Sequence, residues 1–253
     1  HDSSGRMRDG PASGLYRPRR FGVQPRNASR VLSVLPKGVE QITIRLPELK
    51  EKRVAATTDD GKTNILELSF EELQEYFKGL GEPSFRAGQV WQWLWLKGAA
   101  EFAAMTNVSK DLRAKLAERA VIRWPAVETV QESHDGTAKL LLKLADGETV
   151  ETVLIPEKTH FTQCLSTQVG CPMGCTFCST GLMGFTRHMT QGEIVGQILA
   201  ARAWLLAKGE TRTHRNLVFM GMGEPLLNTD NLMRGLRVLH HPQGFEFSSR
   251  RIT

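Results

Sequence analysis

The first part of the chain with a regular hydrophobic pattern, residues 60–125, has the spacing of helices. Apolar side chains that recur at i, i+3 and i+7 lie on one face of a helix. Three segments with such a face follow one another, at 70–79, 85–97 and 110–120. Ser69 and Glu72 form a capping box at the start of the first segment, and Ser109 is a candidate N-cap for the third. We therefore predict a small unit of three helices.

The second predicted helix contains three tryptophans, Trp91, Trp93 and Trp95. Trp91 and Trp95 share the helix face of Val90 and Leu94, so their spacing favours burial in the helical core. Indole rings also stack on nucleic-acid bases when they are exposed. Trp93 is the best candidate for such an exposed ring.

Residues 126–155 change to an alternation of apolar and polar side chains, which is typical of strands. Strands are expected at 126–132, 137–144 and 148–155. Asp135-Gly136 and Asp146-Gly147 lie between them, and Asp-Gly pairs favour tight hairpin turns. The pattern predicts a small antiparallel sheet.

From residue 161 onward, strands and helices alternate. We expect strands at 162–169, 216–220 and 250–253, and helices at 190–207 and 229–240. The βαβαβ order is typical of a parallel sheet with outer helices. A closed parallel barrel needs more strands than these. We therefore predict an α/β fold, with the first half of a (β/α) barrel after a small helical and antiparallel β domain, and expect the native protein to continue beyond Thr253.

The predicted elements divide the chain into four parts: a basic, largely irregular tail at 1–59, a helical unit at 60–125, a small antiparallel β unit at 126–157 and the barrel half at 158–253. Within the tail, only 39–46 alternates weakly like a strand. The net charge of +6 lies entirely in residues 1–38, which hold eight Lys or Arg and two Asp. A basic tail can bind RNA through phosphate neutralisation. It is also typical of a disordered leader, a tag remnant or a transit peptide.

Composition excludes several classes of protein. No apolar run reaches the ~18–20 residues that a membrane-spanning helix needs, and no apolar segment follows the N-terminal charges as in a secretory signal. Four cysteines in 253 residues are too few for a disulfide scaffold.

Three of the four cysteines form one compact motif. Cys171, Cys175 and Cys178 are spaced C-x3-C-x2-C in the segment CPMGCTFC, between a predicted strand and a predicted helix. Three thiolates on one loop can hold three irons of a 4Fe–4S cluster and leave the fourth iron open. A structural zinc site instead uses paired knuckles from two places. His188 is a conceivable fourth zinc ligand, but the spacing favours an iron–sulfur cluster.

The cysteine motif and a second motif together resemble one known family. The segment CLSTQVGCPMGCTFCSTGLMGF begins at Cys164, and FMGMGEPLLN begins at Phe219. With FRAGQVWQWLW and VETVLIPE, these segments resemble the RlmN/Cfr family of radical S-adenosylmethionine (SAM) RNA methyltransferases, and the RlmN branch most closely. The resemblance covers residues 60–253 and not 1–59. It implies a radical SAM (β/α) barrel of which this chain holds the first half.

The resemblance implies roles for individual residues. Cys171, Cys175 and Cys178 would ligate the 4Fe–4S cluster, and Gly223 and Glu224 would hold the amino group of S-adenosyl-L-methionine. Phe177 would pack near the SAM adenine, although ordinary core packing is an equal alternative. Cys164 would resolve a protein–RNA crosslink by forming a disulfide. Glu151 would accept a proton, or would be an exposed strand residue.

The resemblance also implies a reaction. One SAM would methylate a further cysteine, expected beyond Thr253, and a second would be cleaved to a 5′-deoxyadenosyl radical that activates this methyl group. The methyl group would pass to C2 of an adenosine in 23S rRNA and of the tRNA adenosine 3′ of the anticodon. A flavodoxin-type protein would donate electrons to a cytoplasmic monomer, and a plastid location is a minor alternative.

Three other functions stay open on the sequence. A Cfr-like enzyme would methylate C8 of the rRNA adenosine and would share the motifs. A non-catalytic iron–sulfur or RNA-binding module would lack the methyl carrier, and a zinc-stabilised domain would differ in metal content. Several basic residues are candidates for an RNA path or for solvated helix faces: Arg86, Lys97, Lys110, Arg113, Lys115, Arg187, Arg250 and Arg251.

Overall fold

The computed structural model describes Thr58 and residues 61–253, and these residues belong to one compact unit. The weak strand expected at 39–46 and the basic tail lie outside the described residues. The α/β fold predicted from the sequence is confirmed. Among the described residues, no helix is both long enough and apolar enough to cross a membrane.

The helical unit has the three predicted helices and a short two-stranded connection. Its helices are α1 (Phe70–Gly79), α2 (Phe85–Trp91) and α3 (Lys110–Arg119). The capping box of Ser69 and Glu72 is present, and the Ser109 side chain caps α3. Strand β1 (Thr63–Asn64) pairs in parallel with β2 (Ala120–Val121), which joins the two ends of the unit. Short 3-10 helices cover Ile65–Glu67 and Phe102–Ala104.

The predicted helix at 85–97 is not a single α-helix. After Trp91 it continues as a π-helix over Gln92–Leu96, in which the Lys97 amide donates to the Gln92 carbonyl. Trp91, just before the wider turn, and Trp95, within it, are both almost fully buried in the core. The helical face was predicted correctly, and the hydrogen-bond pattern of its last turns was not.

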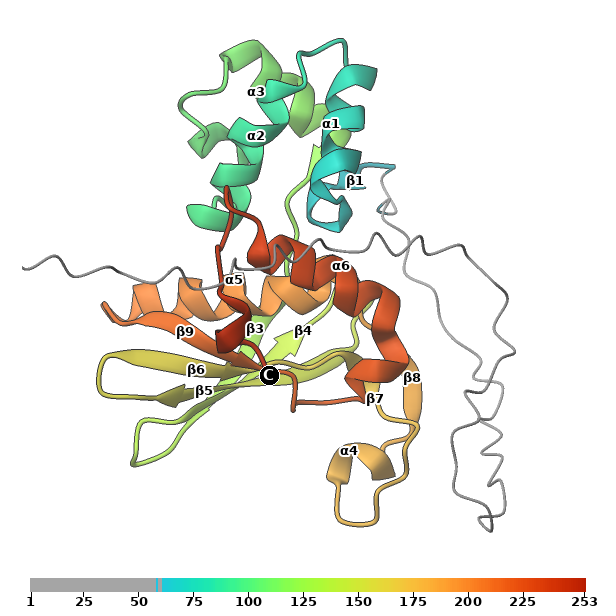
Figure 1. Cartoon of the computed structure of the whole chain (residues 1–253), viewed down its shortest axis with the longest axis vertical. Coiled ribbons are helices and arrows are strands. Elements are labelled where there is room, and N and C mark those ends of the chain that lie inside the picture. The colour runs from blue at the N-terminus through green and yellow to red at the C-terminus, as the bar shows by residue number, and fades with distance from the viewer. Residues whose placement is uncertain (1–57, 59–60) are drawn as a thin grey trace, which may run out of the picture. The chain divides into compact units, whose positions relative to one another are not determined.

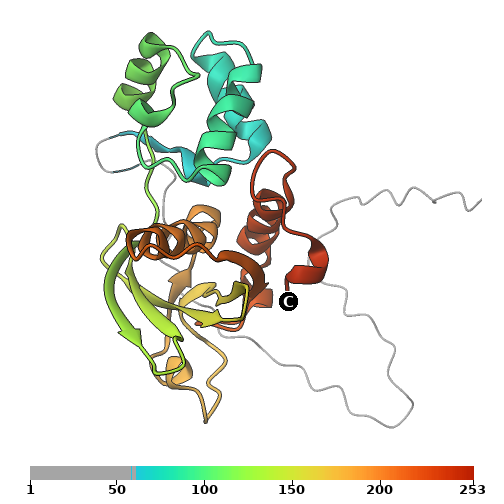
Figure 2. The same cartoon turned by 90° about the vertical axis from the view of Figure 1, so that its left-hand side faces the viewer.

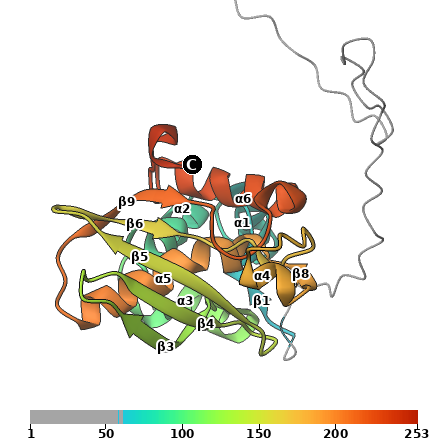
Figure 3. The same ribbon diagram turned by 90° about the horizontal axis from the view of Figure 1, so that it is seen from below.

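One five-stranded sheet runs through the rest of the molecule, in the order β3-β4-β5-β6-β9 (Figures 1 and 3). Its strands are β3 (Ala126–Glu132), β4 (Ala138–Lys143), β5 (Thr149–Pro156), β6 (His160–Cys164) and β9 (Thr213–Val218). Neighbours from β3 to β6 are antiparallel, whereas β6 and β9 are parallel. The pairing of β5 with β6 crosses the boundary expected at 157, so the small β unit and the barrel half share one sheet.

Helix α5 (Gln191–Ala207) connects β6 to β9 as the crossover of a βαβ unit. It lies between the sheet and the helical unit, as Figures 1 and 2 show. Its first turns are buried on all sides, which explains why its apolar residues are not confined to one face. The predicted capping box, Thr190 with Glu193, is present.

The strand expected at 162–169 divides into two. Strand β6 ends at Cys164, and β7 (Gln168–Gly170) belongs to a separate two-stranded sheet with β8 (Phe185–His188). The chain turns between them because Ser166 and Thr167 bond to other segments: the Ser166 amide donates to Gln197, and the Thr167 amide to the carbonyl of Met222. The cysteine loop and the short helix α4 (Ser179–Leu182) lie between β7 and β8.

The last residues follow the predicted order with one difference. After β9 come a 3-10 helix at Pro225–Asn228 and α6 (Thr229–His240). Residues Ser249–Arg251, expected to open a strand, form a 3-10 turn. Ile252 then makes a parallel bridge with Leu217, so the chain reaches the free edge of β9 only at its last two residues.

Candidate active site

The cysteine loop is closed at its base by backbone contacts. The Cys171 amide donates to the Gly184 carbonyl at 2.9 Å, across the β7–β8 pair. Gly170 has φ of +73°, and a Cβ there would lie 1.9 Å from the Gly184 oxygen. Only glycine therefore permits this close approach of the two sides. All four cysteines of the chain are free, and each is partly buried.

The chemistry of the loop suits a group that binds thiolates. Amide hydrogen bonds from Gly181 and Thr180 lower the pKa of Cys178 below its ordinary value. The thiolate is the form of cysteine that ligates metals. Among the residues that the structure describes, however, no three His, Cys, Asp or Glu side chains are grouped closely enough to hold a metal ion. The loop thus supplies three suitable donors in eight residues, and their side chains are not gathered around one centre.

The Gly223-Glu224 segment follows β9 and is held by Gln168 and by a hydrogen bond within the segment. Gly223 has φ of +95°, and a Cβ there would come within 2.5 Å of the Gln168 Cβ. The Glu224 amide donates to Gln168 Oε1 at 2.7 Å. The half-buried Glu224 carboxylate accepts the Leu226 amide at 3.0 Å and so caps the 3-10 helix. This carboxylate is the acidic group of the segment that an ammonium ligand would meet.

The structure brings the two motifs together. The Gly221 amide donates to the Leu165 carbonyl at 3.1 Å, and the Thr167 amide to the Met222 carbonyl at 2.8 Å. The Ser166 hydroxyl accepts the Met222 amide at 2.8 Å. The segment that leads into the cysteine loop therefore lies directly against the segment that leads to Glu224. Carboxyl ends of neighbouring parallel strands are where open α/β sheets bind ligands.

Cys164 and Glu151 lie on one face of the sheet. Cys164 is opposite Val153, and Glu151 is two residues from Val153 on the same strand, so all three side chains project to the same side. Thr152 and Gln163 project to the other side and are buried towards α5, where Gln163 bonds to the Gln197 carbonyl. Burial raises the pKa of the Cys164 thiol. The Glu151 carboxylate forms an ion pair with Lys139 at 2.9 Å.

Comparison with known proteins identifies relatives of this chain. Residues 63–122 match the family model described as the ribosomal RNA large subunit methyltransferase N-terminal domain. A dual-specificity RNA methyltransferase RlmN of Solidesulfovibrio magneticus is 63% identical over 191 residues, which are 76% of this chain and 54% of the relative. The chain belongs to the RlmN family.

Further relatives place this RlmN-family chain in the same group. An RlmN of Nitratidesulfovibrio vulgaris is 62% identical and covers 76% of this chain and 54% of its own length. A crystal structure of a radical SAM methyltransferase from Sphaerobacter thermophilus superposes with a TM-score of 0.68 at 42% identity, over 74% of this chain and 55% of that chain. The chain spans about half the length of the curated relatives it matches. The neighbour confirms the radical SAM fold predicted from the resemblance.

Several residues of the RlmN-family chain differ from the expectations. Phe177 is 91% exposed, so the alternative of core packing is wrong. Trp93 is partly buried against the core, and the Lys97 ammonium lies 3.7 Å from the centre of its ring. Its expected role as an exposed stacking ring is therefore not supported. Arg187, a candidate for an RNA path, is fully buried.

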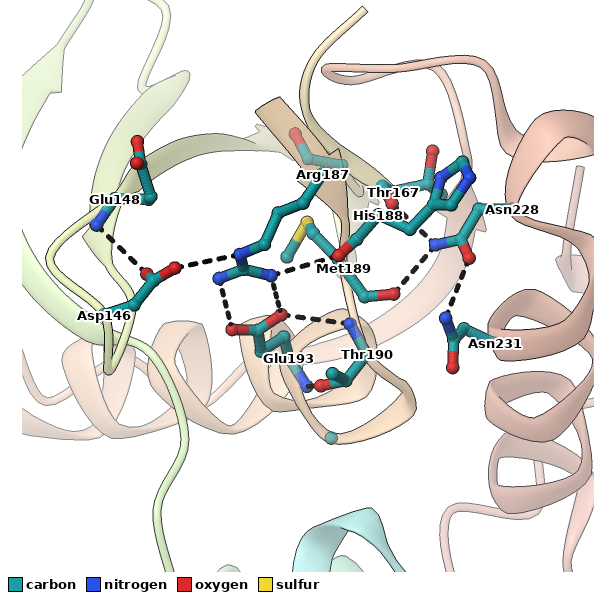
Figure 4. A network of polar contacts seen from close by, with 12 residues as sticks. Asp146, Glu148, Thr167, Arg187, His188, Met189, Thr190, Glu193, Asn228 and Asn231 are labelled. Carbon is teal, nitrogen blue, oxygen red and sulfur yellow. Dashed lines mark hydrogen bonds and ion pairs between the residues drawn. The ribbon is translucent and has the colours of Figure 1, made fainter. Parts of the chain in front are cut away.

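Sequence reasoning missed the buried polar residues that support the site (Figure 4). The Arg187 guanidinium binds both carboxylate oxygens of Glu193 and also contacts Asp146. Asn228 bonds to the segments on both sides of the cysteine loop, and Gln168, which precedes the loop, bonds to His188, which follows it. One feature of the sequence points to Asn228 as a residue of the site: it lies four residues after Glu224, in the same motif. No hydrophobic period marks an isolated buried amide, so the pattern gives no general means to find such residues.

Proposed function

We propose that this chain is the part of an RlmN-type radical SAM methyltransferase that holds the cluster and the SAM amino group, and that the enzyme methylates C2 of adenosine in 23S rRNA and in tRNA. The contact between residues 165–168, which lead into the cysteine loop, and residues 221–224 carries this proposal. It puts the stem of the cysteine loop and the Glu224 carboxylate beyond the ends of the two adjacent parallel strands β6 and β9. The names of the relatives, which describe dual-specificity RNA methyltransferases, support the substrate class.

Cys171, Cys175 and Cys178 would hold a 4Fe–4S cluster, and the Glu224 carboxylate would bind the SAM ammonium by a charge-assisted hydrogen bond. The cluster and SAM together supply one-electron radical chemistry that amino-acid side chains lack. A flavodoxin-type protein would supply the electron. The side chain of Phe177, exposed in the cysteine loop, is available to contact the adenine ring of SAM.

Cys164 would act on the RNA. Burial raises the pKa of Cys164, so its Sγ is protonated at neutral pH and would have to lose this proton before it forms a disulfide. Glu151 projects to the same sheet face, and its carboxylate would have to leave Lys139 to accept a proton. Because these roles account for all four cysteines of the chain, the methyl-carrying cysteine is not among them.

The substrate is tested by inactivating the gene in the source organism and measuring methylated adenosines in 23S rRNA and tRNA by mass spectrometry. We expect 2-methyladenosine to disappear from both RNAs and to return with the wild-type gene, but not with Cys164→Ser. Loss of 8-methyladenosine instead would identify the Cfr-like reaction. Unchanged methylation in both RNAs would contradict the proposed function.

A further inference from the structure

The cysteine loop is attached to the molecule by a narrow stem. Strands β7 and β8 form this stem and make a two-stranded sheet of their own. At its base the Met189 amide donates to the Thr167 carbonyl at 3.0 Å, and Gln168 is paired with His188. An isolated two-stranded hairpin is at best marginally stable. The position of the loop relative to Glu224 therefore depends on contacts between the stem and the rest of the fold.

Asn228 makes one such contact with both sides of the stem. Its Nδ2 donates to the carbonyl of Thr167 and to the carbonyl of Met189, each at 2.8 Å (Figure 4). Its Oδ1 accepts from the Asn231 side chain at 2.9 Å. The residue is 3% exposed, so both amide hydrogens are used inside the protein, one on each side of the stem.

Gln168 makes the complementary contact from the stem to the Glu224 segment. Its Oε1 accepts the Glu224 amide at 2.7 Å, and its Nε2 contacts His188 Nδ1 at 3.0 Å on the opposite stem strand. Its side chain is fully buried, with Gly223 packed against its Cβ. The Gln168 and Asn228 carboxamides thus join the stem to the segment 224–228 at two points. Gln168 reaches this segment at Glu224, and Asn228 reaches the stem from the other end of the segment, four residues later.

We propose that Gln168 and Asn228 are positioning residues, which together fix the cysteine loop in register with Gly223-Glu224. The inference rests on the proposed function, in which one SAM molecule must reach the open iron of the cluster and Glu224 at the same time. We call these two side chains, Gln168 and Asn228, the clamp. The three cluster ligands all lie on the loop itself, so cluster assembly does not need the clamp. SAM binding does need it, because a loop that shifts relative to Glu224 cannot present both contacts to one ligand.

The variants that test the clamp are Asn228→Leu and Gln168→Met, which keep much of the side-chain volume and remove the hydrogen bonds. Asn231→Ala is the matched control, because it removes the bond to Asn228 Oδ1 and leaves both bonds to the stem. The purified chains are reconstituted without oxygen, their iron is counted, and the EPR spectrum of the reduced cluster is titrated with SAM.

We expect all variants to hold as much iron as the wild type. Asn228→Leu and Gln168→Met should need at least about tenfold more SAM than the wild type for the same spectral change. The loss of one or two hydrogen bonds predicts an effect of this size. Asn231→Ala should follow the wild type. Unchanged SAM titration in both clamp variants would overturn the inference. Loss of iron and of thermal stability together would show a structural role and would also overturn it.

Hydrogen exchange on the chains without cluster or SAM gives a second, independent test. The backbone amides of 184–190 and 219–228 should exchange faster in Asn228→Leu and Gln168→Met than in the wild type and Asn231→Ala. Equal exchange in all four chains would overturn the clamp. If the wild-type cluster assembles but does not respond to SAM, the proposed cofactor use fails, and hydrogen exchange then decides the clamp alone.

Discussion

At the scale of single residues, two glycines in the stem of the cysteine loop are constrained in different ways. Gly170 and Gly184 both have positive φ, but their surroundings differ. A Cβ on Gly170 would collide with the Gly184 carbonyl, whereas a Cβ on Gly184 would meet nothing within 4 Å. An alanine at position 184 would cost only the strain of its positive φ. An alanine at position 170 would cost the same strain and would also force the two sides of the stem apart.

This difference predicts the behaviour of two alanine variants. Gly184→Ala should lower the free energy of unfolding by about 1 kcal/mol, the strain of a positive φ. Gly170→Ala should lower it by more and should also reduce the iron retained after reconstitution, because Cys171 shifts with the stem. Thermal unfolding and iron analysis measure the two effects. Equal stability and iron content in both variants would contradict the tight closure of the stem.

At the scale of elements, helix α5 shows what local sequence predicts and what it does not. Its capping box was predicted, because Thr190 and Glu193 are three residues apart. A second cap of the same helix end, made by Glu67, was not predicted, because Glu67 lies more than a hundred residues before Thr190 in the sequence. The Glu67 carboxylate accepts from the Thr190 hydroxyl at 2.7 Å and from the Gly192 amide at 3.1 Å. This contact joins the helical unit to the barrel half.

Glu67 makes the stability of this junction depend on pH. Burial raises its pKa from 4.5 to about 7; the nearby Glu193 also raises it, and Arg234 and the two hydrogen bonds lower it. The folded state therefore holds a proton that the unfolded state releases between these pH values. The free energy of unfolding should fall, by at most about 3 kcal/mol, as the pH rises from 4.5 to 7.

The matched comparison is Glu67→Gln, which keeps an acceptor and does not titrate, with Glu75→Gln as an exposed control. Denaturant unfolding at pH 4.5, 5.5, 6.5 and 7.5 measures the stability of each chain. The difference between the wild type and Glu67→Gln should change with pH in the stated direction, and Glu75→Gln should follow the wild type. A difference that is constant over this range would show that Glu67 is ionised throughout.

At the scale of the whole molecule, periodicity predicted nearly every long helix and strand, and failed where distant contacts decide. The run from 162 to 169 contains no Gly, Pro, Asn or Asp, so it was predicted as one strand. Its division at Cys164 follows from bonds to Gln197 and Met222, which sequence spacing does not reveal. The cysteines and Gly223-Glu224 were found because their spacing is a motif. The buried amides that hold them in register have no such spacing.

The central claim is that the cysteine loop and the Glu224 segment form one site for a cluster and SAM. The most direct measurement is the EPR spectrum of the reduced, reconstituted chain with and without SAM, for the wild type and for Glu224→Gln, together with iron, sulfide and zinc analysis. Glu224→Gln keeps the acceptor for the Leu226 amide and removes the charge that would face the SAM ammonium.

The account predicts about four irons in both chains, a wild-type spectrum that SAM changes, and a Glu224→Gln spectrum that needs at least about tenfold more SAM for the same change. Zinc in place of iron, or a wild-type iron cluster whose spectrum does not respond to SAM, would contradict it.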